Sequence, residues 1–204
     1  MNKTSLTTLP AALALALTLG ACGGGDDPYP YPPTPSGPSI TDCFTVNKAV
    51  TFAVAMSGVP SDAIGANKST VQPTIYDGKA VTGQTFFYPA GTTTYTATSY
   101  WKVTSSGVTF IAEVDIDGTA TPASLFYPQN MTPGQTVTDS NGILYTFIGF
   151  EQITLAGKMF SNVCHTKEAD SHGNSDEVWH APGYGLIKQV NAKSGVTLQY
   201  NGDL

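Results

Sequence analysis

The histidines are the most unevenly placed residues of this chain that could do chemistry. All three of them, His165, His172 and His180, fall in one segment near the C-terminal end. Imidazole nitrogens are common ligands of zinc and copper, so metal chemistry is most plausible here. Whether two imidazoles can share an ion depends on the element that carries them.

Two strands joined by a tight turn are expected around this segment. A two-residue turn at His172-Gly173 makes His165 and His180 directly opposed, and a turn at Gly173-Asn174 makes them diagonal neighbours. Either register puts both imidazoles on one face, with Cβ atoms ~5 to 8 Å apart. His165 and His180 are therefore candidate ligands for zinc or copper. The alternative is that both are solvated on a polar outer face.

The same registers assign the neighbouring residues to faces. Asp176 has the parity of a third ligand, whereas Cys164 and Trp179 fall together on the opposite face. Because Trp179 and a bonded cysteine are the bulkier candidates for burial, we expect their shared face to be the better packed one.

A calcium loop is the second motif with the right residue types. Glu113, Asp115 and Asp117 alternate before Gly118, as the start of such a loop requires. The twelfth position is Ser124 instead of glutamate, and the segment overlaps an alternating strand. A strand that ends in a turn is therefore favoured.

Motifs of common enzyme sites are absent from the sequence. It contains no Gly-x-Ser-x-Gly, no His-Glu-x-x-His and no glycine-rich phosphate loop before a helix. All nine basic residues are lysine and the net charge is -6, which disfavours binding to nucleic-acid phosphates. We predict no catalytic residue, no cofactor and no nucleic-acid partner.

The N-terminal segment has the features of an export signal. Lys3 precedes an apolar run over residues 9–19, and Leu19-Gly20-Ala21-Cys22 follows. This tetrapeptide resembles the lipobox of bacterial lipoproteins. The resemblance implies that residues 1–21 are a signal peptide, that Cys22 is acylated, and that the membrane is a partner through this lipid. Gly23 stands where an inner-membrane retention signal would have aspartate, which favours the outer membrane.

The other two cysteines are expected to form a disulfide bond. If Cys22 carries lipid, Cys43 and Cys164 are the only thiols left, and the compartment beyond the inner membrane is oxidising. A bond between them closes a loop of about 120 residues. The alternative is two separate free thiols.

A tether and one domain account for the rest of the chain. Residues 22–39 are rich in glycine and proline and read as a linker, and residues 40–204 form a single domain. Ten segments of the domain have strand character, with the alternation of apolar and polar residues clearest in the first and fifth. These segments are 50–57, 70–76, 81–88, 93–103, 108–116, 143–154, 158–168, 176–181, 186–192 and 196–200.

Short turns between these segments predict antiparallel neighbours. Residues 143–150 are apolar at both parities, so this strand is expected to be covered on both sides. The predicted fold is all-β, an antiparallel meander that forms a sandwich or a strongly curved half-barrel with one disulfide.

A motif near the C-terminus resembles a recurring pattern in bacterial envelope proteins. It consists of a glycine-phenylalanine turn that enters a strand, here 157–160, and a segment from Trp179 to Lys188 with the sequence WHAPGYGLIK. The first half has one extra residue, which predicts a bulge or a shifted register. Pro182-Gly183 suits a type II turn. The resemblance implies a β-rich domain outside the cytoplasm, with no known activity.

These observations favour an outer-membrane lipoprotein with a non-catalytic structural or binding β domain and an unidentified envelope partner. The alternative is a carrier of an apolar or lipidic ligand, bound in a groove lined by aromatic side chains. Its candidate residues are Phe86, Tyr95, Trp101, Phe110, Phe147 and Trp179.

Overall fold

The computed structural model describes residues 37–60 and 64–204. The predicted signal peptide 1–21, the acylated Cys22 and most of the predicted tether lie outside the described residues. The described part belongs to the compact unit Gly37–Leu204. No helix in it is long and apolar enough to cross a membrane.

The domain is all-β, as predicted. Its strands are β1 (Val50–Ser57), β2 (Lys68–Tyr76), β3 (Lys79–Ala90), β4 (Thr93–Thr104), β5 (Gly107–Val114), β6 (Ala120–Pro122), β7 (Phe126–Pro128), β8 (Thr136–Thr138), β9 (Leu144–Leu155), β10 (Lys158–Ala169), β11 (Ser175–Ala181), β12 (Gly185–Asn191) and β13 (Thr197–Asp203). All ten predicted strands are present. A short helix α1 (Ile40–Phe44) and the short strands β6, β7 and β8 were not predicted, because they are too short to show a period.

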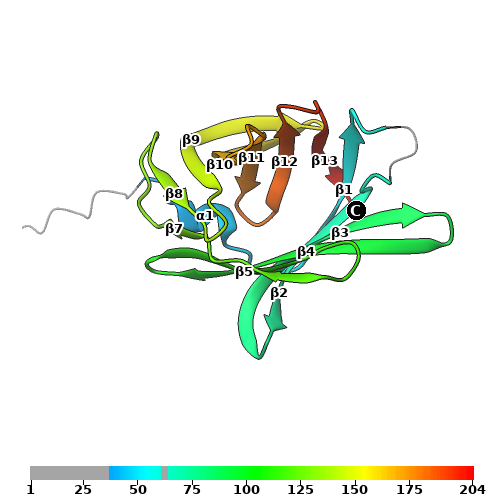
Figure 1. The fold of residues 1–204 in the computed structure, drawn as a ribbon, viewed down its shortest axis with the longest axis horizontal. Helices are drawn as coiled ribbons and strands as arrows, with labels where there is room; N and C mark the ends of the chain where they lie inside the picture. The colour runs from blue at the N-terminus through cyan, green and yellow to red at the C-terminus, as the bar shows by residue number, and fades with distance from the viewer. Residues whose placement is uncertain (1–36, 61–63) are drawn as a thin grey trace, which may run out of the picture. The chain divides into compact units, whose positions relative to one another are not determined.

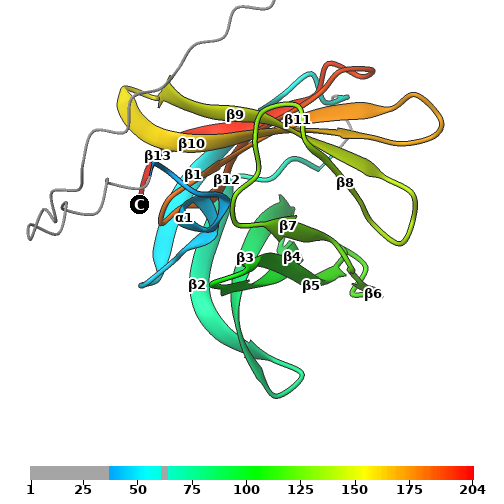
Figure 2. The same ribbon diagram turned by 90° about the vertical axis from the view of Figure 1, so that its left-hand side faces the viewer.

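The strands form one antiparallel sheet built from two meanders. Its order is β6-β5-β4-β3-β2-β1-β13-β12-β11-β10-β9-β8, with β7 paired to β5. The first and last long strands pair, so β1 and β13 join the two meanders. Figure 1 shows β3–β5 facing β9–β13 across the domain, with α1 at one end. In the view of Figure 2, β1 and β2 run between these two layers.

Tight turns of the predicted residue types connect the hairpins. At Asp77-Gly78 and Ala156-Gly157 both residues of the turn have positive φ, as a type I′ turn requires. The predicted bulge after residue 157 is also present. The β9–β10 register shifts between Phe160 and Val163, where Asn162 has φ 56°.

The helix α1 packs against strands of both meanders, held by one disulfide and by apolar contacts. Ile40, Cys43 and Phe44 are fully buried against β4, β5, β10 and β11. Cys43 is bonded to Cys164 of β10, with Cα atoms 5.9 Å apart, which confirms the predicted disulfide. The bond therefore ties the start of the domain to its C-terminal meander.

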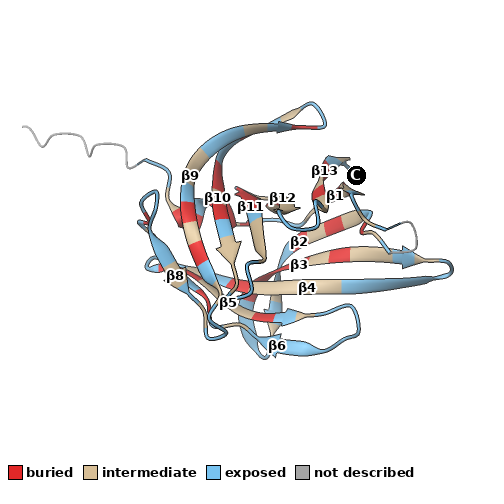
Figure 3. Ribbon diagram, turned by 45° about the horizontal axis from the view of Figure 1, so that its top comes forward, coloured by how far each residue is buried: buried red, intermediate tan, exposed pale blue. Residues whose placement is uncertain are grey.

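One prediction about β9 is wrong. Tyr145 and Phe147 are buried, but Leu144 is 40% and Ile148 43% exposed. Figure 3 shows buried and exposed positions along this strand. Leu144 and Ile148 therefore stay in solvent, whereas Phe150, at the same parity, is half-buried and packs against Phe147.

The predicted register of the β10–β11 hairpin is also wrong. Cys164 pairs with His180 and His165 with Trp179, so residues of equal parity oppose each other. The cause is the loop, in which three residues separate Asp170 from Asn174. The Asp170 carboxylate accepts hydrogen bonds from the backbone N–H of His172 at 2.8 Å and of Asn174 at 2.9 Å.

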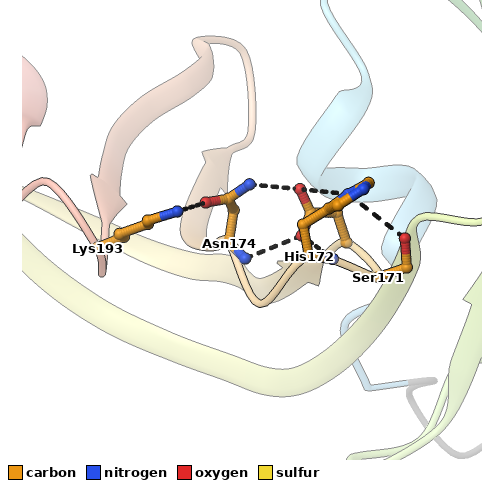
Figure 4. A network of polar contacts seen from close by, with 5 residues as sticks. Ser171, His172, Asn174 and Lys193 are labelled. Atoms are coloured by element: carbon orange, nitrogen blue, oxygen red, sulfur yellow. Dashed lines mark hydrogen bonds and ion pairs between the residues drawn. The ribbon is translucent and has the colours of Figure 1, made fainter.

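Further contacts fix this loop (Figure 4). The Asn174 amide also donates to Asp170, and Lys193 donates to the Asn174 side-chain oxygen at 2.9 Å. Gly173 has φ 80°, the left-handed conformation that a three-residue loop needs. Adding one residue to a two-residue turn reverses the relative parity of the two strands.

Candidate functional site

A cavity of about 420 Å³ lies between the two meanders. Residues of β3, β4 and β5 line one side, and residues of β9 to β12 line the other. We call the sheet surface that faces this cavity the inner face and the opposite surface of the same strands the outer face.

Gln84 of β3 connects the two sides of the cavity. It is 2% exposed, donates to the backbone oxygen of Leu186 in β12 at 2.9 Å, and accepts from the Leu186 N–H at 2.7 Å. A Cβ at the adjacent Gly185 would lie 2.4 Å from the Gln84 side-chain oxygen, and Gly185 has φ 65°. Only glycine fits there, because a side chain would be strained and would displace Gln84.

Aromatic residues close the end of the cavity near α1. The Trp101 indole N–H donates to the backbone oxygen of Phe44 at 2.9 Å. The Phe44 ring also packs on the imidazole of His180, with centroids 4.4 Å apart. Helix α1 therefore forms part of the packed support behind the site.

Carboxylates supply the charge of the cavity wall. Four of the residues that line it are acidic, and no lysine is among its lining residues in the described part of the chain. The acidic residues are Glu113, Asp115, Asp139 and Glu168. Glu113 and Asp115 are exposed, whereas Asp139 and Glu168 are partly buried. The wall therefore carries negative charge from its exposed rim towards its interior.

Glu168 is the most perturbed of these carboxyl groups. It faces Tyr145 of β9 and Asp176 of β11 as cross-strand neighbours. Burial raises its pKa from 4.5 to about 8, and repulsion from nearby carboxylates, of which Asp176 is the strongest, adds to this shift. Glu168 therefore carries a proton through much of the neutral range.

Two ionisable groups near Glu168 also have raised pKa values. Partial loss of hydration at the rim of the cavity raises the pKa of Glu113, and the charges of Asp115 and Asp139 raise it further. Burial and the charge of Glu168 raise the pKa of Tyr145. Three ionisable groups from β5, β9 and β10 are thus electrostatically coupled across the cavity.

His180 also lines the cavity, on the same face of β11 as Asp176. Its side chain is 8% exposed, and its Nδ1 atom has no hydrogen-bond partner among the described residues. Burial lowers its pKa from 6.5 to about 3, so the imidazole is neutral at physiological pH. The site therefore contains a neutral imidazole with an unused nitrogen.

His165 lies on the outer face of the same hairpin, among charged and aromatic neighbours, although its Nε2 atom has no hydrogen-bond partner among the described residues. Its ring stacks on Trp179 with centroids 4.2 Å apart, and its nitrogens lie 3.5 Å from Glu151 and 3.3 Å from Glu177. The Trp179 indole N–H donates to Glu151, and the Lys188 ammonium lies over the indole ring, 4.3 Å from the ring centroid. We call these five residues the outer cluster.

The proposed metal pair of His165 and His180 is therefore wrong. The odd-length loop places the two imidazoles on opposite faces of the hairpin, so they cannot share an ion. The expected grouping of Cys164 with Trp179 fails for the same reason. No group of three or more potential metal ligands occurs within residues 37–60 and 64–204. His172 lies in the hairpin loop, and Asp117-Gly118 forms the expected turn.

A second depression, of about 870 Å³, lies beside α1 and the C-terminal strand. Asp42, Lys48, Tyr184 and Asp203 are among its lining residues. Its charges are mixed, and Asp203 is paired with Lys158 at 2.7 Å. It is a weaker candidate than the cavity between the meanders, where charge of one sign has no partner.

Sequence reasoning named the cavity aromatics Phe86, Trp101 and Phe110 but missed Gln84, Asp139 and Glu168. A usable signal was present at Glu168, which has the strand parity of Cys164, a cysteine already expected to be buried. Gln84 gave a second signal, since it shares parity with Phe86 on an otherwise apolar face. No pattern in the sequence brings Glu113 or Asp139 to the same place, because they come from a different meander and from a loop.

Comparison with known proteins leaves the function open. No protein-family model matches the chain, and no curated protein matches it. One similar solved structure is that of a protein from Bacteroides fragilis NCTC 9343, described as having a YmcC-like fold and presumed to be exported. The two chains share 11% identity and a TM-score of 0.46, over 78% of this chain and 95% of the other. A similarity of this degree does not assign a function to the chain.

Proposed function

We propose that this protein is an outer-membrane lipoprotein whose β domain binds a small ligand in the cavity between its two meanders, without catalysis. The cavity is the observation that carries the proposal. Its volume of about 420 Å³ lies in the usual range for small-molecule sites, and polar groups converge on it from both sides. The lipid anchor at Cys22 and the tether 22–39 rest on the lipobox resemblance.

A binding role fits the construction of this site. Gln84 links the two meanders across the cavity and the disulfide ties α1 to β10 behind it, so the shape of the cavity is formed before a ligand arrives. A preformed site loses less conformational entropy on binding. Meanwhile the polar groups that line the site keep unused capacity, as at His180.

The alternative of an apolar carrier has narrower support. Phe86, Trp101 and Phe110 line the cavity, as that hypothesis expects. Tyr95, Phe147 and Trp179 are not among the residues that line it, and the four carboxylates make its wall costly for a lipidic ligand. A ligand with polar or charged groups is favoured.

Native mass spectrometry of the full chain, purified from its own cell envelope, tests the binding role. Ala97 lines the cavity, and its strand neighbour Thr96 is exposed. Ala97→Trp should fill the site and remove a bound mass that wild type and Thr96→Trp retain. If all three proteins carry the same bound mass, or none carries any, the cavity is not a binding site.

Metabolic labelling with a fatty acid tests the anchor independently. Wild type should be labelled, and Cys22→Ser should not, because the thiol is the site of acylation. Equal labelling of both proteins would exclude the anchor while leaving the binding role intact.

A further inference from the structure

We propose that the cavity selects an organic cation that carries primary or secondary amines, with Glu168, Glu113 and Asp139 as its counter-charges. This inference rests on the proposed binding function and names the chemical class of the ligand. Its basis is the position of the carboxylates, the lack of any lysine among the residues that line the cavity, and the unused nitrogen of His180.

The charge of the cavity wall decides the sign of the ligand. The residues that line it include four carboxylates, and the chain contains no arginine that could reach the site from elsewhere. A concave surface with charge of one sign concentrates ions of the opposite sign. An anionic ligand would be repelled, and a neutral one would leave the carboxylates without a counter-charge, even though Asp139 and Asp115 accept backbone hydrogen bonds.

The spacing of the carboxylates decides the size of the ligand. They come from β5, from the segment between β8 and β9, and from β10, and no three ligating groups in the described residues are close enough to hold a metal ion. A bare cation therefore cannot contact them together. A molecule with amines separated by several methylene groups can do so, and its carbon chain can pack on Trp101 and Phe110.

His180 provides a point of recognition beyond charge. Its buried imidazole is neutral, and its Nδ1 atom has no partner among the described residues. A buried polar atom without a partner is costly unless something bonds to it. An amine N–H supplies the missing hydrogen bond, whereas a quaternary ammonium, which has no N–H, does not.

Proton release should accompany binding. Glu168 holds a proton near neutral pH because of burial and of the charges of Asp176, Glu113 and Asp139. Tyr88, Asp115, Tyr145 and His180 are the other titratable groups that line the cavity. A cation beside Glu168 favours its ionised form, so the proton leaves to solvent and the carboxylate pairs with the amine.

Isothermal titration calorimetry of the full chain in a nonionic detergent tests this inference, with 1,4-diaminobutane and spermidine as probes. We expect one saturable site for the amines and none for 1,4-butanediol or succinate, which match the diamine in length. Titrations in buffers of different ionisation enthalpy should show proton release near neutral pH. Glu168→Gln should weaken amine binding roughly tenfold and abolish that release.

Glu177→Gln is the matched control, because it makes the same substitution on the outer face of the same hairpin. It should leave amine binding unchanged. An equal loss in Glu177→Gln and Glu168→Gln would mean attraction to the net charge alone and would overturn the inference. Binding of the diol, blocked by Ala97→Trp, would retain the proposed binding function and reject the cation. Binding of no probe at all, while wild type still carries a bound mass that Ala97→Trp lacks, would also reject only the cation.

Discussion

The two faces of the β10–β11 hairpin carry similar residues in opposite states. On the outer face, His165 lies between Glu151 and Glu177 and stacks on Trp179. On the inner face, His180 and Glu168 face a cavity, and Nδ1 of that histidine has no partner among the described residues. Each face has one imidazole and at least one glutamate, yet only the outer face pairs them.

The difference shows that pairing, more than composition, separates a structural cluster from a candidate site. The outer cluster brings groups of opposite charge within ion-pair distance, although Nε2 of His165, like Nδ1 of His180, has no hydrogen-bond partner among the described residues. The inner face brings carboxyl groups together, with Glu168 directly opposite Asp176, and Glu168 keeps a proton near neutral pH as a result of this crowding and of burial. Like charges at opposed positions of a sheet destabilise it. An arrangement that costs stability is expected where a ligand supplies the missing partner.

The largest effect is expected from removing the disulfide, which holds α1 behind the inner face. The two cysteines are 121 residues apart in sequence. The double variant Cys43→Ala, Cys164→Ala should lower the free energy of unfolding by about 4 to 5 kcal/mol, because the unfolded chain regains loop entropy. Urea denaturation measures this change, with Cys22→Ala as the control. A loss below ~1 kcal/mol would show that the inner face needs no covalent support.

A second, smaller effect should come from Gln84→Leu. The change leaves the N–H and the carbonyl of Leu186 without their partner across the cavity, and an unsatisfied buried polar group costs about 1 to 3 kcal/mol. Gln152→Leu, at an exposed position of β9, should change stability by less than about 0.5 kcal/mol. Equal urea midpoints for the two variants would contradict the role of Gln84 as a link between the meanders.

The smallest effect, and the most specific, is the pH dependence due to Glu168. Because its pKa is raised from 4.5 to about 8, the folded state holds a proton that the unfolded state has released. The free energy of unfolding should therefore fall as pH rises towards 8. Above that pH, Glu168→Gln should be more stable than wild type by roughly 1 kcal/mol, a value reduced for solvent screening.

This comparison is best made by urea denaturation at pH 6.5 and above. Below pH 6.5 the buried, neutral His180 has the opposite effect. The unfolded state gains a proton there that the folded state does not, so the free energy of unfolding decreases as the pH is lowered. Glu177→Gln should keep the pH dependence of wild type. If Glu168→Gln also keeps it, the inner carboxylate is not the group that titrates.

Much of the fold could be predicted because its signals are local. Alternation of apolar and polar residues located ten strands, and turn pairs such as Asp77-Gly78 and Ala156-Gly157 joined them into an antiparallel meander. Glycine at these positions removes the steric cost of positive φ, which is a property of the residue itself. The Cys43–Cys164 bond could also be predicted, because the expected acylation of Cys22 leaves two cysteines to pair.

The faces of the β10–β11 hairpin could not be predicted from alternation. The Asp170 carboxylate accepts hydrogen bonds from the backbone N–H groups of His172 and Asn174, and these bonds stabilise a loop that is one residue longer than a two-residue turn. A single residue in a turn reverses which side chains share a face, because the side-chain period of a strand is two. Sequence pattern alone therefore gave the parity within each strand and left the parity between them open.

The sequence by itself determined which segments become strands and where most turns fall, since both depend on residue type and near neighbours, and the small number of cysteines allowed the disulfide to be predicted. Only the tertiary structure decided that Glu113, Asp139, Glu168 and His180 meet at one cavity. They come from both meanders, and their approach depends on the pairing of β1 with β13 and on the curvature of the whole sheet. Those long-range features arise from the burial of the shared core, which no local pattern encodes.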